Sequence, residues 1–146
     1  MAVDVMAAIE IGRPRAEVAS FAMEAENDPK WIGGISSARR LTEPPTDVGT
    51  RVERLASFLG RRIQYVMEVT EYVPKERITM QSIKSPFPMR VTYSFEDAGS
   101  STRASIRVEG DGSGFYAKAG SLLGPAVKRS IVRDLKSLRA LLGDDA

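Results

Sequence analysis

The amino-acid sequence predicts an α+β fold, in which an antiparallel sheet of about seven strands packs on one long C-terminal helix. Three observations lead to this prediction. Apolar and polar residues alternate at the start of the chain. From about residue 35 to 111, short alternating segments are separated by turn signals. Over residues 115–142 the apolar residues return to helical spacing.

The start of the chain predicts one strand and two short helices. The apolar residues at alternate positions are Val3, Val5, Ala7, Ile9 and Ile11. Pro14 stands where a first short helix can begin, and the segment NDPKW at 27–31 is typical of the start of a second. Asn27 or Asp28 caps this second helix, and Gly33–Gly34 ends it.

The middle of the chain predicts six strands in an antiparallel meander. Turn signals separate them at PPTDVG (44–49), LGRR (59–62), VPKE (73–76) and DAGS (97–100). A turn at Gly60–Arg61 sets Arg54 opposite Met67, and the same reasoning for the DAGS hairpin sets Tyr93 opposite Ala104. Gly124–Pro125 is expected to interrupt or bend the last helix.

The last helix has one apolar face and many basic residues. The apolar face carries Val127, Ile131, Leu135, Leu138 and Leu142. The basic residues around it are Lys128, Arg129, Arg133, Lys136 and Arg139. We expect them to form a solvated surface and not a site for nucleic acid or acidic membranes, because Asp134 and the acidic tail offset their charge.

A sheet of this size has one apolar face, and the terminal helix is the one large element available to cover it. A strongly twisted sheet does not close tightly along a single helix, so we expect a cavity between them. The two hairpins place one row of residues inward: Val52, Arg54, Ala56, Phe58, Ile63, Tyr65, Met67, Val69, Met89, Val91, Tyr93, Phe95, Thr102, Ala104, Ile106 and Val108.

Arg54 is the one charged residue in this inward row. A buried charge without a partner costs several kcal/mol, so Arg54 needs a carboxylate, carbonyls, water or an anionic ligand. One interpretation is a polar handle for a carboxylate, phenolate or enolate oxygen of an otherwise apolar ligand. The alternative is that Arg54 reaches solvent at the strand end or pairs with an acid from a loop.

The candidate ligand-binding residues come from this row, from the covering helices and from Met80, which suits an adaptable lining. They are Trp31, Arg54, Phe58, Tyr65, Met67, Met80, Tyr93, Phe95, Ile106, Val127 and Ile131. Core packing is the alternative role for the tyrosines, the tryptophan and the methionines, because buried tyrosines usually satisfy their hydroxyl in the core and methionine fills irregular gaps. No residue is assigned as catalytic.

Composition narrows the chemistry further. The sequence has no cysteine and no histidine, which excludes disulfides, thiolate nucleophiles, zinc hydrolase sites and Ser-His-Asp or Cys-His catalysis. We expect no metal and no cofactor. A net charge of +2 in 146 residues does not indicate a nucleic-acid partner, and the length suits a single domain over 1–146. Without an apolar run of about 18 residues or a signal peptide, we expect a cytoplasmic protein with no integral membrane segment.

Several phrases of the sequence resemble the START-like (SRPBCC) superfamily, and within it the polyketide cyclase/dehydrase and lipid-transport group. They are IEIGRPRAEVASF, NDPKWIGG, VTEYVPKERI, VTYSFEDAGSSTRASIRVEG and RDLKSLRALLG, and the resemblance covers nearly the whole chain. It implies the helix-grip fold, a curved antiparallel sheet that grips the long terminal helix and encloses a hydrophobic cavity. None of these phrases is a catalytic signature, so the resemblance implies more about fold than about activity.

Three functions remain open at this point. The first is binding or transport of a small hydrophobic ligand, such as a lipid, polyketide or aromatic metabolite, in the internal cavity. The second is a cyclase or dehydratase acting on a poly-keto substrate, with Arg54 stabilising enolate charge and Tyr65 or Tyr93 moving a proton. The third is an interaction module whose groove receives a partner segment. The sequence leaves the oligomeric state and the presence of catalysis undecided.

Overall fold

The computed structural model describes residues 3–58, 60–84, 88–110 and 123–143, and its elements follow the predicted order. The strands are β1 (Val3–Ile11), β2 (Ile35–Arg40), β3 (Arg51–Phe58), β4 (Arg61–Val73), β5 (Arg77–Lys84), β6 (Met89–Ala98) and β7 (Ser101–Gly110). The helices are α1 (Arg15–Ala22), the 3₁₀ turn η1 (Ala25–Asn27), α2 (Asp28–Trp31) and α4 (Leu123–Leu142).

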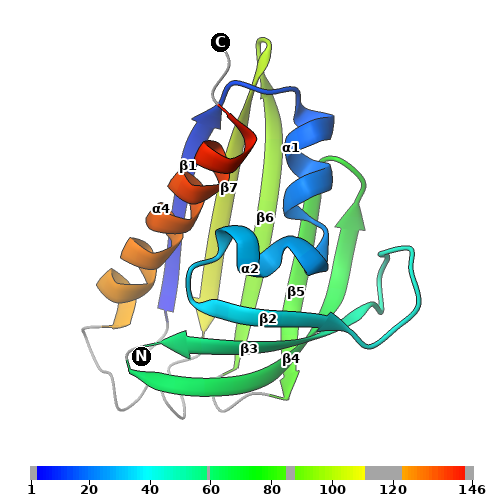
Figure 1. Cartoon of the computed structure of the whole chain (residues 1–146), viewed down its shortest axis with the longest axis vertical. Coiled ribbons are helices and arrows are strands. Elements are labelled where there is room, and N and C mark those ends of the chain that lie inside the picture. The colour runs from blue at the N-terminus through cyan, green and yellow to red at the C-terminus, as the bar shows by residue number, and fades with distance from the viewer. Residues whose placement is uncertain (1–2, 59, 85–87, 111–122, 144–146) are drawn as a thin grey trace.

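The seven described strands form one antiparallel sheet in the order β1-β7-β6-β5-β4-β3-β2. Sequence neighbours from β2 to β7 pair as a meander, and β1 pairs with β7 at the edge of the sheet opposite β2. Figure 1 shows the sheet curving around the helices, with α1, α2 and α4 on the same side of it. This is the helix-grip arrangement, and the α+β fold predicted from the sequence is confirmed.

Both hairpin registers differ from the prediction by two residues. Phe58 pairs with Arg61, so the first turn falls one residue earlier than expected and Arg54 lies opposite Tyr65 instead of Met67. Gly60 has φ = +77°, a conformation that glycine adopts without steric penalty in tight hairpin turns. In the second hairpin, Tyr93 lies opposite Ile106. A shift of two residues changes cross-strand partners but keeps every side chain on its predicted face.

One prediction about helix ends stays a prediction and another is corrected. Pro125 lies two residues after Leu123, where the described helix α4 begins, so the interruption or bend expected at Gly124–Pro125 depends on the residues before it. The part of the predicted helix at 115–122 lies outside the described residues. At α2, neither expected capping bond is present, because Asn27 Nδ2 donates to the Phe21 carbonyl and Asp28 contacts Arg54.

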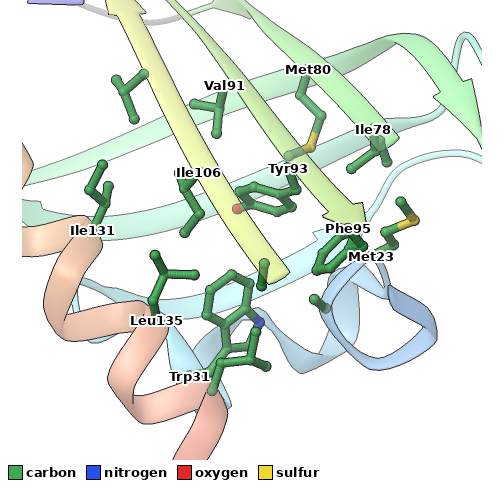
Figure 2. Close-up of a cluster of buried hydrophobic side chains, with 14 of the residues drawn as sticks. Met23, Trp31, Ile78, Met80, Val91, Tyr93, Phe95, Ile106, Ile131 and Leu135 are labelled. Atoms are coloured by element: carbon green, nitrogen blue, oxygen red, sulfur yellow. The ribbon is translucent and has the colours of Figure 1, made fainter. Parts of the chain in front are cut away.

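The apolar faces meet in one core between the sheet and the helices. Val127, Ile131, Leu135 and Leu138 of α4 are buried there, as their spacing predicted. α4 packs mainly on β1, and α1 packs on β6 and β7. Figure 2 shows part of this cluster, in which the Trp31 ring lies near Tyr93 and Leu135. In the described part of the chain, no helix is long and apolar enough to span a bilayer.

Candidate functional site

A cavity of about 150 Å³ lies between the inner face of the sheet, α4 and the segment that follows α2. Side chains from β3, β4, β6, β7 and α4 form a mostly apolar wall. The wall includes Arg54, which is 4% exposed, and Arg133, whose side chain is 61% exposed. The cavity therefore runs from a buried end to an open one, and its volume is on the order of a single aromatic ring.

Six of the predicted ligand-binding residues line this cavity: Arg54, Tyr65, Tyr93, Ile106, Val127 and Ile131. Four others are buried in the surrounding core instead: Trp31, Met67, Met80 and Phe95. The prediction for Phe58 concerns a side chain outside the described part of the structure. Alternation along a strand predicts which side chains point inward, but it does not distinguish an inward side chain that meets another from one that meets empty space.

The buried end of the cavity contains an ion pair that joins α2 to β3. Arg54 Nε donates to Asp28 Oδ2 at 3.0 Å, and Arg54 Nη2 lies 2.9 Å from the same oxygen. Asp28 is 2% exposed, so both charges are withdrawn from bulk water. Arg54 therefore pairs with an acid, as the alternative interpretation expected, but the acid comes from the first residue of α2 and not from a loop. The positive charge of Arg54 already has a neutralising partner.

The ionisation of this pair follows from its surroundings. Burial raises the pKa of Asp28, while the adjacent Arg54 charge acts in the opposite direction. For Arg54, burial has the largest single effect and lowers the pKa, but Asp28, Tyr93 and Tyr65 together outweigh it and hold the guanidinium pKa above its usual range. Two short contacts to one carboxylate oxygen indicate that Asp28 is ionised at neutral pH. The buried end of the cavity is thus close to electroneutral.

Tyr93 extends this polar cluster. Arg54 Nη2 also donates to the Tyr93 hydroxyl at 3.4 Å, and burial raises the pKa of Tyr93, so its phenol stays protonated near neutral pH. The Trp31 ring packs edge-on against Tyr93, with centroids 5.5 Å apart and an interplanar angle of 63°. Trp31 thus helps to position a cavity-lining residue although it does not line the cavity itself.

The segment after α2 closes one wall because it is held from both sides. The Gly34 carbonyl accepts a hydrogen bond from the Ser57 N–H of β3 at 2.8 Å, and a Cβ on Gly34 would lie 3.0 Å from the Ser57 carbonyl oxygen. A side chain at position 34 would therefore require the two backbones to move apart by a few tenths of an ångström. On the other side, the Gly33 N–H donates to Asp134 Oδ1 of α4 at 3.0 Å.

Asp134 is a cavity residue that the sequence analysis placed on the surface. It is 6% exposed and lines the cavity with its α4 neighbours Ser130 and Arg133. Burial raises its pKa, against the hydrogen bond from Gly33. A signal was present in the sequence, since Asp134 stands three residues after Ile131 and four before Leu138, which places it on the apolar stripe.

The remaining wall residues come from the segment after α2 and from the inner face of the sheet. They are Ile32, Gly34, Ile35, Ala56, Ile63, Met89, Val91 and Val108. Those on β3, β4, β6 and β7 lie on the face of the sheet that the alternation of the sequence predicted to point inward. Those after α2 carry no sequence signal of their own, because their position depends on the contacts of Gly34 and Asp134. Among the described residues, no cluster of three acidic side chains is arranged to hold a metal ion.

Comparison with known proteins places this geometry in a family. The model of the family described as polyketide cyclase / dehydrase and lipid transport matches residues 2–143. A solved structure from Thermus thermophilus is similar with a TM-score of 0.81 and 19% identity, covering 94% of each chain. No curated protein matches the chain.

Two further solved structures carry descriptions of their type. The Zhui aromatase/cyclase from Streptomyces sp. R1128 has a TM-score of 0.82 at 13% identity, over 97% of this chain and 93% of its own. A START superfamily protein from Mycobacterium smegmatis has a TM-score of 0.81 at 14% identity, over 94% and 95% of the two chains. At such identities, structural likeness shows the fold alone. Because the family model spans nearly the whole chain, the protein belongs to the polyketide cyclase / dehydrase and lipid transport family.

Proposed function

We propose that this protein binds a small, predominantly apolar molecule whose polar end is neutral. The observation that carries the proposal is the cavity of about 150 Å³, with an apolar wall and one compact polar cluster at its buried end. Ligand sites commonly combine an apolar lining with a few polar groups that orient the ligand. The enclosed volume suits about one ring of such a molecule, and a longer ligand would extend toward Arg133 at the open end.

The Arg54–Asp28 pair is the reason to expect a neutral polar end. A carboxylate ligand would bring a second negative charge beside Asp28 into a site withdrawn from water, and burying an uncompensated charge is costly. Within the described residues, the hydrogen bonds and the ion pair of the Arg54 side chain are made by Nε and Nη2. Nη1 is therefore left to donate a hydrogen bond to a ligand. A ketone, enol or alcohol oxygen accepts a hydrogen bond from such a group without adding charge.

The test uses two ligands of the same shape and different charge. Acetophenone and benzoate share one ring and a planar oxygen-bearing substituent, but benzoate is an anion at neutral pH. We expect acetophenone to bind at least about tenfold tighter in calorimetric or NMR titrations of the purified chain. Equal or tighter binding of benzoate would contradict the neutral polar end. Binding of neither ligand, together with no copurified apolar molecule in native mass spectrometry, would contradict the proposed function as a whole.

A cyclase or dehydratase acting on a poly-keto substrate is the second candidate, and Asp134 favours it. Its carboxyl group is buried in the cavity wall with a raised pKa, which brings it closer to the range useful for proton transfer at neutral pH. Tyr93 is suited to donating a hydrogen bond and not to abstracting a proton, because burial raises its pKa.

For this second function, we expect Asp134→Asn to lower the rate of cyclisation of a poly-keto substrate by about 100-fold or more. Asparagine keeps an oxygen for the Gly33 N–H but cannot exchange a proton, so acetophenone affinity should change little. The measurement is product formation by liquid chromatography, with acetophenone titration as the control. An unchanged rate in the variant would remove Asp134 from the reaction.

A further inference from the structure

The outer face of α4 carries an unusual excess of positive charge. The helix contains five basic residues, Lys128, Arg129, Arg133, Lys136 and Arg139, and one acidic residue, Asp134. All of the basic residues except the half-buried Arg139 are exposed. Arg129, Arg133 and Lys136 follow one another at intervals of four and three residues, so they form a row along the outside of the helix. We call this row the basic face.

The burial of Asp134 removes the charge that was expected to offset this face. Asp134 points into the protein and accepts the Gly33 N–H, and its closest approach to a basic residue is 3.7 Å, to Arg133. The other acids counted against this interpretation, Asp144 and Asp145, lie outside the described residues. Within the described residues, the basic face therefore has little acidic compensation.

Individual contacts support the same conclusion. Lys128 Nζ donates to the Met6 carbonyl of β1 at 2.6 Å, and Arg133 has its weak contact with Asp134. Among the described residues, the side chains of Arg129 and Lys136 have no hydrogen-bond or ion-pair partner. Like charges three and four residues apart repel one another and weakly destabilise a helix. A surface of opposite charge would remove that repulsion.

We propose that the basic face docks on an anionic lipid bilayer and that the cavity exchanges its ligand there. The basic residues match a negatively charged surface, to which each exposed lysine or arginine adds attraction. An acidic protein partner fits less well, because protein interfaces rely on aromatic and other large anchors and α4 has no aromatic residue. The docked orientation also brings the open end of the cavity to the bilayer, since Arg133 belongs both to the basic face and to the cavity wall.

The position of α4 agrees with this orientation. Figure 1 shows α4 at one flank of the molecule, along β1. Small apolar molecules concentrate in bilayers, so a cavity that opens beside the docking face would receive them directly. The exchange of ligand at the bilayer rests on the proposed function, whereas docking itself rests on the basic face alone.

The test compares the wild-type chain with Arg129→Gln/Lys136→Gln. Neither residue lines the cavity, and glutamine keeps a helix propensity close to that of lysine and arginine. We expect the wild-type chain to sediment with phosphatidylcholine vesicles that contain phosphatidylserine, but not with phosphatidylcholine alone. The double variant should bind the anionic vesicles about 25-fold more weakly, since each basic residue near such a surface contributes on the order of fivefold. Raising the ionic strength from about 0.1 M to about 1 M should release the wild-type chain.

The matched control is Arg62→Gln/Lys75→Gln, which removes the same charge from exposed positions on β4 and the β4–β5 turn. This control should retain vesicle binding to within a few-fold. Equal losses in both variants, or no binding of the wild-type chain to anionic vesicles, would overturn the proposal. Binding to poly-glutamate but not to vesicles, dependent on Arg129 and Lys136, would assign the face to an acidic protein instead. Acetophenone titration of each variant reports separately on the cavity, so failure of docking and failure of ligand binding are distinguishable.

Discussion

Replacing Asp28 by leucine is expected to lower the free energy of unfolding by about 3–5 kcal/mol, because it leaves the Arg54 guanidinium buried without its partner. Leucine branches at the same carbon as aspartate and has the same number of non-hydrogen atoms, so the change removes charge and hydrogen bonding, although the two methyl groups take more space than the carboxylate oxygens. The measurement is urea unfolding followed by circular dichroism. Both side chains are at most 4% exposed, so water cannot replace the lost carboxylate without opening the structure.

A double variant separates the ion pair from other effects at this position. Arg54→Met/Asp28→Leu replaces both charges by apolar side chains, and its stability should return to within about 1 kcal/mol of the wild type. If the losses of the two single variants simply add in the double variant, the two charges do not depend on one another and the assignment is wrong. A decrease of less than about 1 kcal/mol in the free energy of unfolding for Asp28→Leu alone would also show that the assignment is wrong.

The same variant also tests the charge argument behind the proposed ligand. In folded Asp28→Leu, the Arg54 charge faces the cavity without a neutralising carboxylate. Benzoate should then bind more tightly than acetophenone, which reverses the wild-type preference. Unchanged preference would mean that the ion pair does not select the charge of the ligand.

The second large effect is expected for Ala56→Phe, which fills the cavity from β3. Ala56 is half-buried and lines the wall beside Ile63 and Tyr65, so a phenyl group at this position occupies the space of the ligand. We expect acetophenone to lose contacts equivalent to about three buried methylene groups, at ~0.8 kcal/mol each. Its binding should therefore be on the order of 50-fold weaker. The measurement is the calorimetric titration used for the wild-type chain.

Ser57→Phe is the matched control, since Ser57 is the next residue of β3 and its exposed side chain points to the opposite face of the sheet. Acetophenone affinity should remain within a few-fold of the wild type there. If both phenylalanine variants weaken binding equally, the ligand does not occupy this cavity. A thermal unfolding curve for each variant shows whether Ala56→Phe still folds.

Much of the fold was accessible from the sequence because it depends on local periodicity. The period of two in the strands and the spacing of Val127, Ile131 and Leu135 in α4 assign each residue to a face without knowledge of its partners. Both hairpin registers were wrong by two residues, and the inward row still survived, since only an odd shift moves side chains to the other face. Arg54 was therefore placed in the interior correctly.

The candidate site was only partly accessible, for reasons that particular residues show. Asp28 stands 26 residues before Arg54 on a short helix, so nothing in its own segment indicates that it crosses to β3. Met67 and Tyr65 share one inward row, yet Met67 is packed in the core and Tyr65 lines the cavity. That difference depends on which elements cover each part of the sheet.

The sequence by itself determined the class of fold, the inward face of each strand, the apolar stripe of α4 and the absence of cysteine and histidine chemistry. These properties follow from residue types and from the short repeat distances of strands and helices. Only the tertiary structure decided that Arg54 is neutralised by Asp28, that the side chain of Asp134 is buried on the inner side of α4, and where the cavity remains open. Those outcomes depend on contacts between distant segments, which are set by how the curved sheet, α2 and α4 pack together.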